Sequence, residues 1–392
     1  MTAPYDVAVV GAGPAGATAA LLLARGGKRV ALIERETLPR YKTCGGGVVG
    51  RAFQVLPDDV KLPVEHACFA AEAHFLESEM SFRVERDVPI VSMTMRADLD
   101  KAIADAAVAS GAELLAPCAL IELKQDADGV DLETTRGTIR AAWVVGADGV
   151  LSTVARKAGW THAPRTIPAL EIEARVPADV HARFAGVARF DFEAMEAGYG
   201  WVFPKRDHLS CGILTMQRGL GGLHEELDRY LARVGVTGVL SLERHGYVIP
   251  VKPRRGGFVR GRVLLAGDAA GFADALTGEG ISIAMSSARI AAQAILETRD
   301  GRVGVAYARA LRRDLLPELF IARGLAWIAY RRRGLMRAAF RARGAELTER
   351  VADVFLGTRT YRSLVTRPGS YLSLLRGSLV ASARASPAST RG

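Results

Sequence analysis

Apolar and polar residues follow two different patterns along the chain. Short apolar runs rich in β-branched residues, typical of buried parallel strands, occupy residues 5–10 (YDVAVV), 29–34 (RVALIE), 142–147 (AWVVGA) and 262–266 (RVLLA). Two segments that follow such runs predict helices, 17–28 (ATAALLLARGGK) and 281–297 (ISIAMSSARIAAQAILE). Strands that alternate with helices predict the α/β fold class, with a Rossmann-like sheet as the nucleotide-binding unit.

In the second pattern, apolar and polar residues alternate from one position to the next, which predicts an inserted antiparallel sheet. This alternation occurs in FDFEAM (190–195), GYGWVFP (198–204) and LSCGILTM (209–216). From about residue 301 the pattern becomes helical and rich in Ala, Leu and Arg. We therefore predict a discontinuous nucleotide-binding domain (1–60, 96–160 and 255–300), a substrate sheet domain (61–95 and 161–254), a C-terminal helical basic region (301–380) and a disordered tail (381–392).

The turn after the first strand reads GAGPAG and predicts a dinucleotide site. Gly11 permits the tight turn, Gly13 lets the backbone approach a pyrophosphate, and Gly16 lets the helix pack close to the strand. Glu34 ends the second strand, where its carboxylate can accept hydrogen bonds from a ribose; this acidic residue disfavours NADP and favours FAD or NAD. We assign this part of the cofactor to Gly11, Gly13, Ala15, Gly16, Glu34 and Arg35.

Two later segments favour FAD over NAD. Residues 146–149 read GADG, and residues 267–271 read GDAAG before the helix at 281–297. One nucleotide site that uses three separated segments suits the elongated FAD molecule, and a helix N-terminus favours phosphate or flavin. We assign further cofactor contacts to Cys44, Gly45, Arg96, Asp148, Gly267, Asp268, Gly278, Gly280 and Ile281.

These three fingerprints, in this order, resemble those of FAD-dependent oxidoreductases with the p-hydroxybenzoate hydroxylase fold, and Arg96 matches the arginine that opens a helix beside FAD in them. Three classes share that fold: aromatic monooxygenases, flavin-dependent halogenases and isoprenoid-chain reductases. GYGWVFP lacks the WxWxIP motif of the halogenases. It resembles the YxWxFP segment of the geranylgeranyl reductase family, and YKTCGGG (41–47) resembles that family's Cys-Gly-Gly segment; the resemblance covers about residues 5–290.

The resemblance implies a substrate site around Cys44. In the family this cysteine lines the cavity near the flavin ring, whereas the sequence alone leaves open a buried structural thiol or a reactive one. Gly46 and Gly47 would let an alkene approach the backbone closely. Tyr199, Trp201 and Phe203 alternate onto one face, which suits a prenyl chain, an aromatic ring or ordinary sheet core. The predicted catalytic residues are Cys44, Tyr199 and Trp201, and the predicted substrate contacts are Gly46, Gly47, Tyr199, Trp201 and Phe203.

The predicted reaction is saturation of an isoprenoid double bond in a prenyl lipid, quinone or pigment precursor. It requires a hydride from reduced FAD and a proton, and aromatic faces would stabilise developing positive charge. NADPH or reduced ferredoxin is the expected electron donor. The alternative is a monooxygenase or halogenase of the same fold that acts on an aromatic or polyketide-like molecule, and a third reading is a non-enzymatic electron-transfer flavoprotein. The seven histidines show no metal-ligand spacing, and no metal is expected.

The net charge of +10 changes the picture for the C-terminal region alone. Residues 301–392 hold 18 arginines against 5 acidic residues, a net of +13, so the first 300 residues carry −3. Trp327 and Tyr330 precede three arginines, which predicts either docking on an anionic membrane or a helical cap with solvated arginines. No nucleic-acid motif accompanies the charge.

The remaining features of the sequence concern location. The four cysteines stand far apart, no signal peptide is recognisable, and no run of about 18 apolar residues occurs. We expect a protein of the cytoplasm, peripheral on the inner face of the membrane; the sequence leaves the oligomeric state open.

Overall fold

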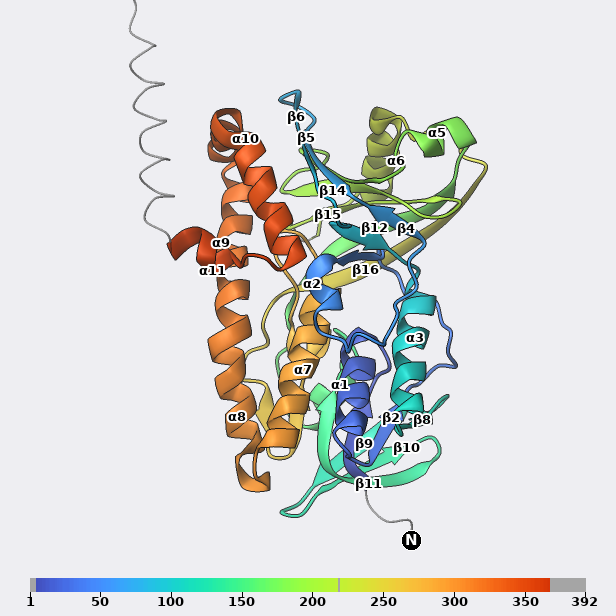
Figure 1. The fold of residues 1–392 in the computed structure, drawn as a ribbon, viewed down its shortest axis with the longest axis vertical. Helices are drawn as coiled ribbons and strands as arrows, with labels where there is room; N and C mark the ends of the chain where they lie inside the picture. Colours follow the sequence, from blue (N-terminus) through green and yellow to red (C-terminus); the bar gives the residue numbers. More distant parts are fainter. Residues whose placement is uncertain (1–4, 218, 367–392) are drawn as a thin grey trace, which may run out of the picture.

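The computed structural model of the chain describes residues 5–217 and 219–366. A sheet with helices on its face forms the lower half of the molecule, a second sheet forms the upper half, and the C-terminal helices run along one side of both (Figure 1). The predicted tail 381–392 and the end of the predicted helical region lie outside the described residues.

The lower sheet has eight strands. Its order is β17 (Val259–Arg260), β18 (Val263–Leu265), β11 (Gly137–Gly146), β1 (Tyr5–Val10), β2 (Val30–Ile33) and β8 (Glu113–Leu115), with β10 (Val130–Thr134) and β9 (Leu120–Gln125) added at β11. The pairs β18–β11, β11–β1 and β1–β2 are parallel, as the buried apolar runs predict. The parallel pair β2–β8 adds a partly exposed strand that the sequence analysis did not predict. The antiparallel pairs β9–β10 and β10–β11 are additions that the Rossmann-like expectation did not include.

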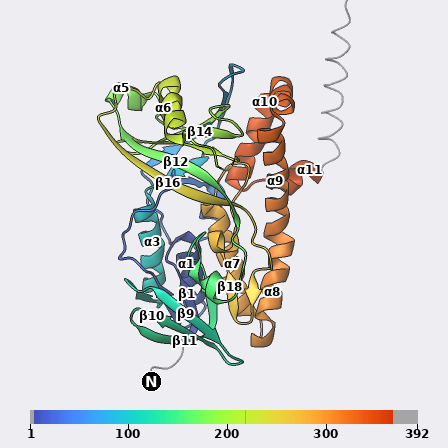
Figure 2. The ribbon, with the colours of Figure 1, turned by 180° about the vertical axis from the view of Figure 1, so that it is seen from behind.

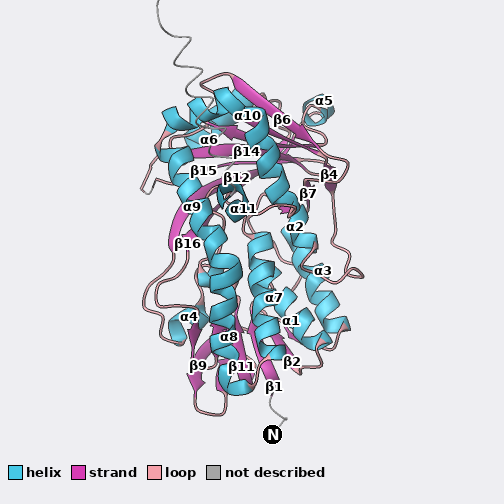
Figure 3. Cartoon of the chain, turned by 60° about the vertical axis from the view of Figure 1, so that its left-hand side comes forward, coloured by secondary structure: helices cyan, strands magenta, loops and turns pink. Residues whose placement is uncertain are grey.

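Three helices cover one face of this sheet (Figure 3). They are α1 (Pro14–Arg25), α3 (Arg96–Ala109) and α7 (Ile281–Glu297), and α1 contacts both of the others. The helix α1 begins three residues earlier than predicted, because Pro14 suits a first helical position, and it ends at Arg25 because Gly26 and Gly27 follow. The predicted helix 281–297 is confirmed. Short helices α2 (Gly50–Phe53) and α4 (Thr153–Lys157) and the turn η1 (Gly267–Ala270) lie in the connections.

The upper sheet has seven strands and forms a roof over the lower half (Figure 2). Its order is β16 (Ser241–Lys252), β12 (Arg165–Arg175), β15 (Leu209–Thr215), β14 (Gly198–Pro204), β13 (Val187–Phe192), β5 (Ala70–Phe75) and β6 (Met80–Glu85). All pairs are antiparallel except β13–β5. Helices α5 (Ala178–Ala182) and α6 (Leu223–Val234) cover its outer face, and a small sheet of β3 (Gly47–Val49), β7 (Val91–Met93) and β4 (His66–Cys68) lies below it.

The C-terminal helices connect the two halves. They are η2 (Asp300–Arg302), α8 (Val303–Ala310), the π-helical turn η3 (Leu311–Leu315), α9 (Leu316–Arg331), α10 (Arg333–Leu356) and α11 (Tyr361–Thr366). The helical pattern of 320–346 is broken at Arg332, whose φ of −121° and ψ of 52° are not helical. Because the chain turns there, α10 folds back to contact β6 and α2, and the inner face of the roof is covered by α9 and α10.

Candidate functional site

The turn between β1 and α1 has the close contacts that a dinucleotide-binding turn requires. Gly11 has φ of +101°, and a Cβ there would lie 2.5 Å from the Ala147 carbonyl oxygen. A Cβ on Gly16 would lie 1.7 Å from the Gly11 carbonyl oxygen, so only glycine lets α1 reach the strand. Gly13 is the N-cap of α1, and Ala15 lies in its first turn. The spacing of the three glycines therefore has a steric cause in this chain.

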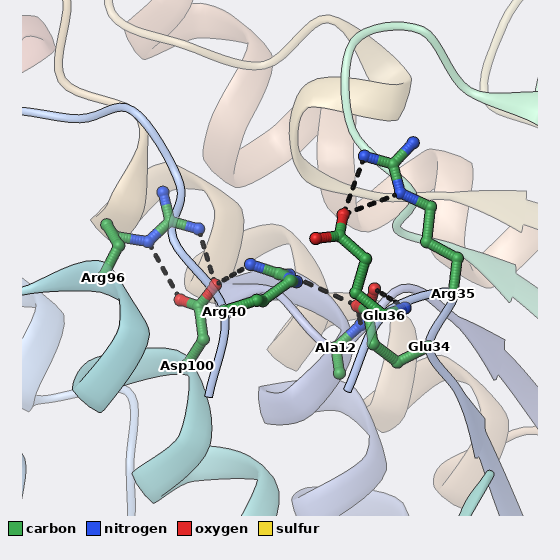
Figure 4. A network of polar contacts seen from close by, with 7 residues as sticks. All are labelled: Ala12, Glu34, Arg35, Glu36, Arg40, Arg96 and Asp100. Atoms are coloured by element: carbon green, nitrogen blue, oxygen red, sulfur yellow. Dashed lines mark hydrogen bonds and ion pairs between the residues drawn. The ribbon is translucent and has the colours of Figure 1, made fainter. Parts of the chain in front are cut away.

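A buried ionic network extends from this turn toward α3 (Figure 4). The Glu34 carboxylate accepts a hydrogen bond from the Ala12 backbone N–H (2.8 Å) and contacts Arg40 (3.2 Å). Arg40 also contacts Asp100 (3.1 Å), which receives two hydrogen bonds of 2.9 Å from Arg96. The first turn of α3 thus orients Arg96 by a carboxylate on the following turn.

The donors in this network fit a nucleotide diphosphate. The place of a Cβ on Gly13 lies 3.7 Å from Arg96 Nη2 and 4.0 Å from Arg40 Nη2, so two guanidinium groups face the N-terminus of α1. Cations and unpaired backbone N–H groups at a helix N-terminus attract phosphate. Arg35 lies at the edge of this network: its exposed side chain pairs with Glu36 at 3.1 Å, and the Glu36 backbone N–H donates to Glu34 Oε1 at 3.2 Å.

Sequence reasoning missed Arg40 and Asp100. Asp100 was recognisable only as a carboxylate four residues after Arg96 on a predicted helix, a spacing that favours ion pairs. Arg40 lies in an irregular segment, and the contacts that reveal its role join residues 34, 40 and 100, which only the fold brings together.

The third fingerprint places Asp268 in the turn η1, between β18 and α7. Gly267 has φ of +55°, and its N–H donates a hydrogen bond to Ser287 Oγ (2.9 Å). Burial raises the pKa of Asp268, and the charges of Lys42 and Arg96 oppose this shift. Gly278, with φ of +70°, and Gly280 lead into Ile281 at the start of α7.

Lys42 is a further residue that sequence reasoning missed. Burial, and then the charge of Arg96, lower its pKa to about 8. Its Nζ lies 2.8 Å from the centroid of the Tyr247 ring, between the roof and the lower half. Its position two residues before Cys44, within a motif already singled out, was the available signal.

Asp148 has a structural task in this chain. Its carboxylate accepts hydrogen bonds from the Ser152 hydroxyl and from the backbone N–H groups of Thr153 (2.6 Å) and Val154 (3.0 Å). These contacts satisfy N–H groups at the start of α4. The GADG segment thus ends in a capped helix rather than in a free carboxylate.

The loop of residues 41–47 lies between the lower half and strand β14, and its glycines are required by protein contacts. A Cβ on Gly45 would lie 3.0 Å from Trp201 Nε1, and one on Gly47 would lie 3.3 Å from the Phe203 ring. Gly46 has φ of +67°, and its N–H donates to Cys44 Sγ at 3.4 Å. The bare backbone therefore lets the loop pack closely against an aromatic strand, a reason that the sequence did not reveal.

Lys205 holds this loop from the roof. Its buried ammonium donates hydrogen bonds of 2.8 Å to the carbonyl oxygens of Gly45 and Thr94. Lys205 continues the alternation of Tyr199, Trp201 and Phe203 by one more step, so the same periodicity could have identified it. Tyr199, Trp201 and Phe203 share one face of β14, and Lys205 follows directly after the end of this strand.

Aromatic side chains line this face of the roof. Phe190 pairs with Trp201, and Phe192 pairs with both Tyr199 and Phe75 across adjacent strands. They continue to a small gap between the roof and helices α9 and α10, which has a volume of about 10 Å³ and is lined by Phe75, Phe192, Tyr330, Arg333 and Met336. The Tyr199 hydroxyl donates to the Thr277 carbonyl oxygen, so in this structure it ties the roof to the loop before α7.

Comparisons with known proteins agree with this geometry. A family model described as an FAD binding domain matches residues 4–202. A digeranylgeranylglycerophospholipid reductase of Methanothermobacter thermautotrophicus is 34% identical over 76% of this chain and 80% of that protein. A menaquinone reductase of Mycolicibacterium smegmatis is 26% identical over 90% of this chain and 94% of that protein.

A solved structure shares the fold: a geranylgeranyl bacteriochlorophyll reductase-like protein of Thermoplasma acidophilum aligns with a TM-score of 0.66 and 24% identity over 90% of each chain. Fold and site together define an FAD-dependent oxidoreductase with a p-hydroxybenzoate hydroxylase-like architecture. More narrowly, the chain belongs to the geranylgeranyl reductase family.

Proposed function

We propose that this protein reduces isoprenoid carbon–carbon double bonds of a prenyl lipid, quinone or pigment precursor. The observation that carries this proposal is the seating of Cys44 and its glycine loop against the aromatic face of β14, beside the dinucleotide turn. Two similar relatives, by their names, act on a digeranylgeranylglycerophospholipid and on menaquinone. Both molecules carry prenyl chains, which an uncharged aromatic wall can bind without leaving buried charges unpaired.

Bound FAD would supply the hydride, and the residues of this chain would bind and orient both molecules. Arg96 and Arg40 would attract the diphosphate, and Glu34 would accept from the ribose. Cys44 and Trp201 would hold the reacting bond, and the prenyl tail would follow the aromatic face of the roof toward Tyr330. We also propose that the chain is divided as the sequence predicts, into a discontinuous cofactor domain, a substrate sheet domain and a C-terminal helical region.

The reaction itself is testable with reduced protein under anaerobic conditions. Incubation with geranylgeranyl diphosphate or with a prenylated quinone should add two hydrogen atoms for each reduced bond, as read by mass spectrometry. NADPH and reduced ferredoxin are the donors to compare. A product that requires oxygen and contains an added oxygen or halogen atom would instead establish a monooxygenase or halogenase.

Replacement of Cys44 should change turnover but not cofactor binding. Its Sγ accepts a hydrogen bond from the Gly46 N–H and also contacts the Arg96 guanidinium, whose two hydrogen bonds to Asp100 do not depend on the thiol. We expect Cys44→Ser and Cys44→Ala to retain FAD. The rate should fall about tenfold or more, or the set of double bonds that are reduced should change. Flavin absorbance and product mass spectra measure the two effects, and variants that match the parent in both would assign Cys44 to packing alone.

The same proposal includes docking of α9 on an anionic membrane. None of the helices in the described part of the chain is both long and apolar enough to cross a bilayer. Phe320 and Trp327, 67% and 53% exposed, lie seven residues apart on α9. The guanidinium of Arg323 lies 5.3 Å from the Phe320 ring, and that of Arg332 lies 4.9 Å from the Trp327 ring. Exposed aromatic residues with adjacent cations suit an anionic lipid surface.

The double substitution Phe320→Ser with Trp327→Ser should weaken binding to vesicles that contain phosphatidylglycerol by about tenfold or more, since two large apolar side chains no longer insert. Vesicle co-sedimentation measures this effect. Val305→Ser is the control, because Val305 is 60% exposed on α8 and should not alter binding. A double variant that sediments like the parent would contradict the docking surface.

A further inference from the structure

The inner face of the roof divides into an aromatic half and an acidic half. Residues paired across adjacent strands point to the same face of a sheet. One such row runs from Glu171 on β12 through Gly212 on β15 to Trp201 on β14, and a parallel row runs from Glu173 through Ser210 to Phe203. The boundary is at Gly212, where a Cβ would lie 2.2 Å from the Trp201 ring. The indole therefore lies over Gly212, toward the acidic half.

The acidic half contains a connected set of polar groups. The Ser210 hydroxyl donates to Glu171 Oε1 at 2.7 Å, and the two glutamates are also hydrogen-bonded to each other. His208 Nε2 lies 2.9 Å from Glu173 Oε2, and His208 Nδ1 lies 2.8 Å from Asp207 Oδ1. Glu171 is 3% exposed, whereas the side chain of Asp207 is 49% exposed. The set thus reaches from the protein interior to solvent.

Glu171 and His208 are two groups in this set with a raised pKa. Burial opposes the shift of His208, but its contacts with Glu173 and Asp207 raise its pKa. Burial, and then the charge of Glu173, raise the pKa of Glu171 to about 8. Burial lowers the pKa of Lys205, whose ammonium contacts Gly45 in the substrate loop. The other titratable or charged groups that face the pair are Tyr41 from the loop, Asp207 and His208 from the segment before β15, Cys211 on β15, and Glu243 and His245 on β16. Cys44 and Glu65 act on Lys205.

We propose that Glu171 and Glu173 share and store the proton that completes the reduction beside the Cys44 loop, and that Asp207 and His208 refill this store from solvent. The inference rests on the proposed function, because saturation of a double bond adds one hydride and one proton. Reduced FAD, when bound, would supply the hydride for one carbon and would be oxidised. The proton from the store adds to the other carbon, the pair is left with one more negative charge, and a proton from water restores it.

The sign of the pH dependence follows from this role. The store works only when Glu171 is protonated, so the rate of the alkene-reduction step should be high below about pH 8 and fall above it. A residue that only supports the sheet would not give this dependence. Lys205 and Ser210 act in the inference as positioning residues.

The test compares Glu171→Gln with Glu243→Gln in full-length, FAD-loaded protein. Glutamine at position 171 can still accept from Ser210 and donate to Glu173, but it cannot release a proton at neutral pH. Glu243 occupies the row beside Glu173, and its side chain is 75% exposed. Single-turnover reduction of the prenyl substrate is measured from pH 6 to 10 (a range of about two pH units on each side of the expected transition), together with the rate at which the donor reduces FAD.

We expect Glu171→Gln to slow alkene reduction by about 100-fold at pH 7 and to remove the loss of rate near pH 8, with FAD reduction unchanged. Glu243→Gln should match the parent. A Glu171→Gln variant with the parental rate and pH profile would overturn the inference while leaving the proposed function intact. Parent protein that reduces no prenyl substrate would remove the function instead.

Infrared spectroscopy tests whether Glu171 and Glu173 hold a proton, without the need for turnover. The parent should show a protonated-carboxyl C=O band that titrates near pH 8, and this band should be missing in Glu171→Gln. Glu173→Gln removes the neighbouring charge, so the midpoint of the band should move to lower pH; this variant decides the question if Glu171→Gln does not fold. A band that is unaffected by the available substitutions would overturn the inference.

Discussion

The substitution Gly16→Ala is expected to abolish FAD binding and to lower the free energy of unfolding by about 3 kcal/mol. The added Cβ would lie 1.7 Å from the Gly11 carbonyl oxygen and 3.2 Å from the Ala147 side chain. The first of these contacts is to backbone, which cannot turn aside like a flexible side chain. To relieve it, α1 must move away from β1 and β11, and the N-terminus of the helix then leaves the phosphate-binding position.

Flavin absorbance of the purified variant and its thermal midpoint measure these two effects. Gly324→Ala is the matched control, because Gly324 lies in α9 with no heavy atom within 4 Å of the place of a Cβ. At an exposed helical site, alanine should stabilise the protein by about 0.5–1 kcal/mol. The same replacement should therefore act with opposite signs at the two positions. If the Gly16→Ala protein binds FAD and has the parental thermal midpoint, the close contact between Gly16 and Gly11 is not required.

The substitution Gly46→Ala is expected to lower turnover about 100-fold while FAD stays bound. Gly46 has φ of +67°, and a Cβ there would lie 2.0 Å from the Thr94 carbonyl oxygen and 2.3 Å from Lys205 Nζ. The loop would have to leave its place against β14, which breaks the hydrogen bond from Lys205 to Gly45. The dinucleotide turn is not touched, so the cofactor should remain.

Gly186→Ala separates backbone strain from steric contact in this experiment. Gly186 has φ of +75°, close to that of Gly46, but no heavy atom lies within 4 Å of its Cβ position. Both variants therefore carry a left-handed strain of about 1–2 kcal/mol, and only one also displaces its neighbours. Stopped-flow rates with flavin spectra should show a turnover defect in Gly46→Ala alone. Equal rates in the two variants would mean that the position of the loop does not matter to the reaction.

The elements of the lower sheet could be predicted because their signals are local. The runs that became β1, β2, β11 and β18 are apolar over consecutive residues, and glycine spacing marked the turn before α1. Tyr199, Trp201 and Phe203 could be placed on one face because alternation needs only neighbouring positions. The hairpin of β9 and β10 was missed because its polar, partly exposed strands lack a long apolar run.

The ionic parts of the site could not be predicted in this way. Arg40 gains its meaning from Glu34 and Asp100, and Lys205 from the carbonyl oxygen of Gly45, 160 residues away in the sequence. In the sequence, Glu171 looks like an ordinary polar position of a strand. It is the fold that buries its carboxyl group, against β15 and the neighbouring glutamate. Such roles arise from tertiary contacts, which periodicity and short motifs do not encode.

The position of β18 in the lower sheet has a consequence for how the protein is made. Strand β18 (Val263–Leu265) pairs with β11 (Gly137–Gly146), and the strands of the whole roof are translated in between, except β5 and β6. A nascent chain that has emerged only as far as the roof exposes an unpaired edge of β11 and lacks Asp268 and α7. Exposed sheet edges favour aggregation, and pairing across such long separations is slow. Capture of FAD is therefore a late event in biogenesis, and the ribosome must release most of the polypeptide before the cofactor has a complete site.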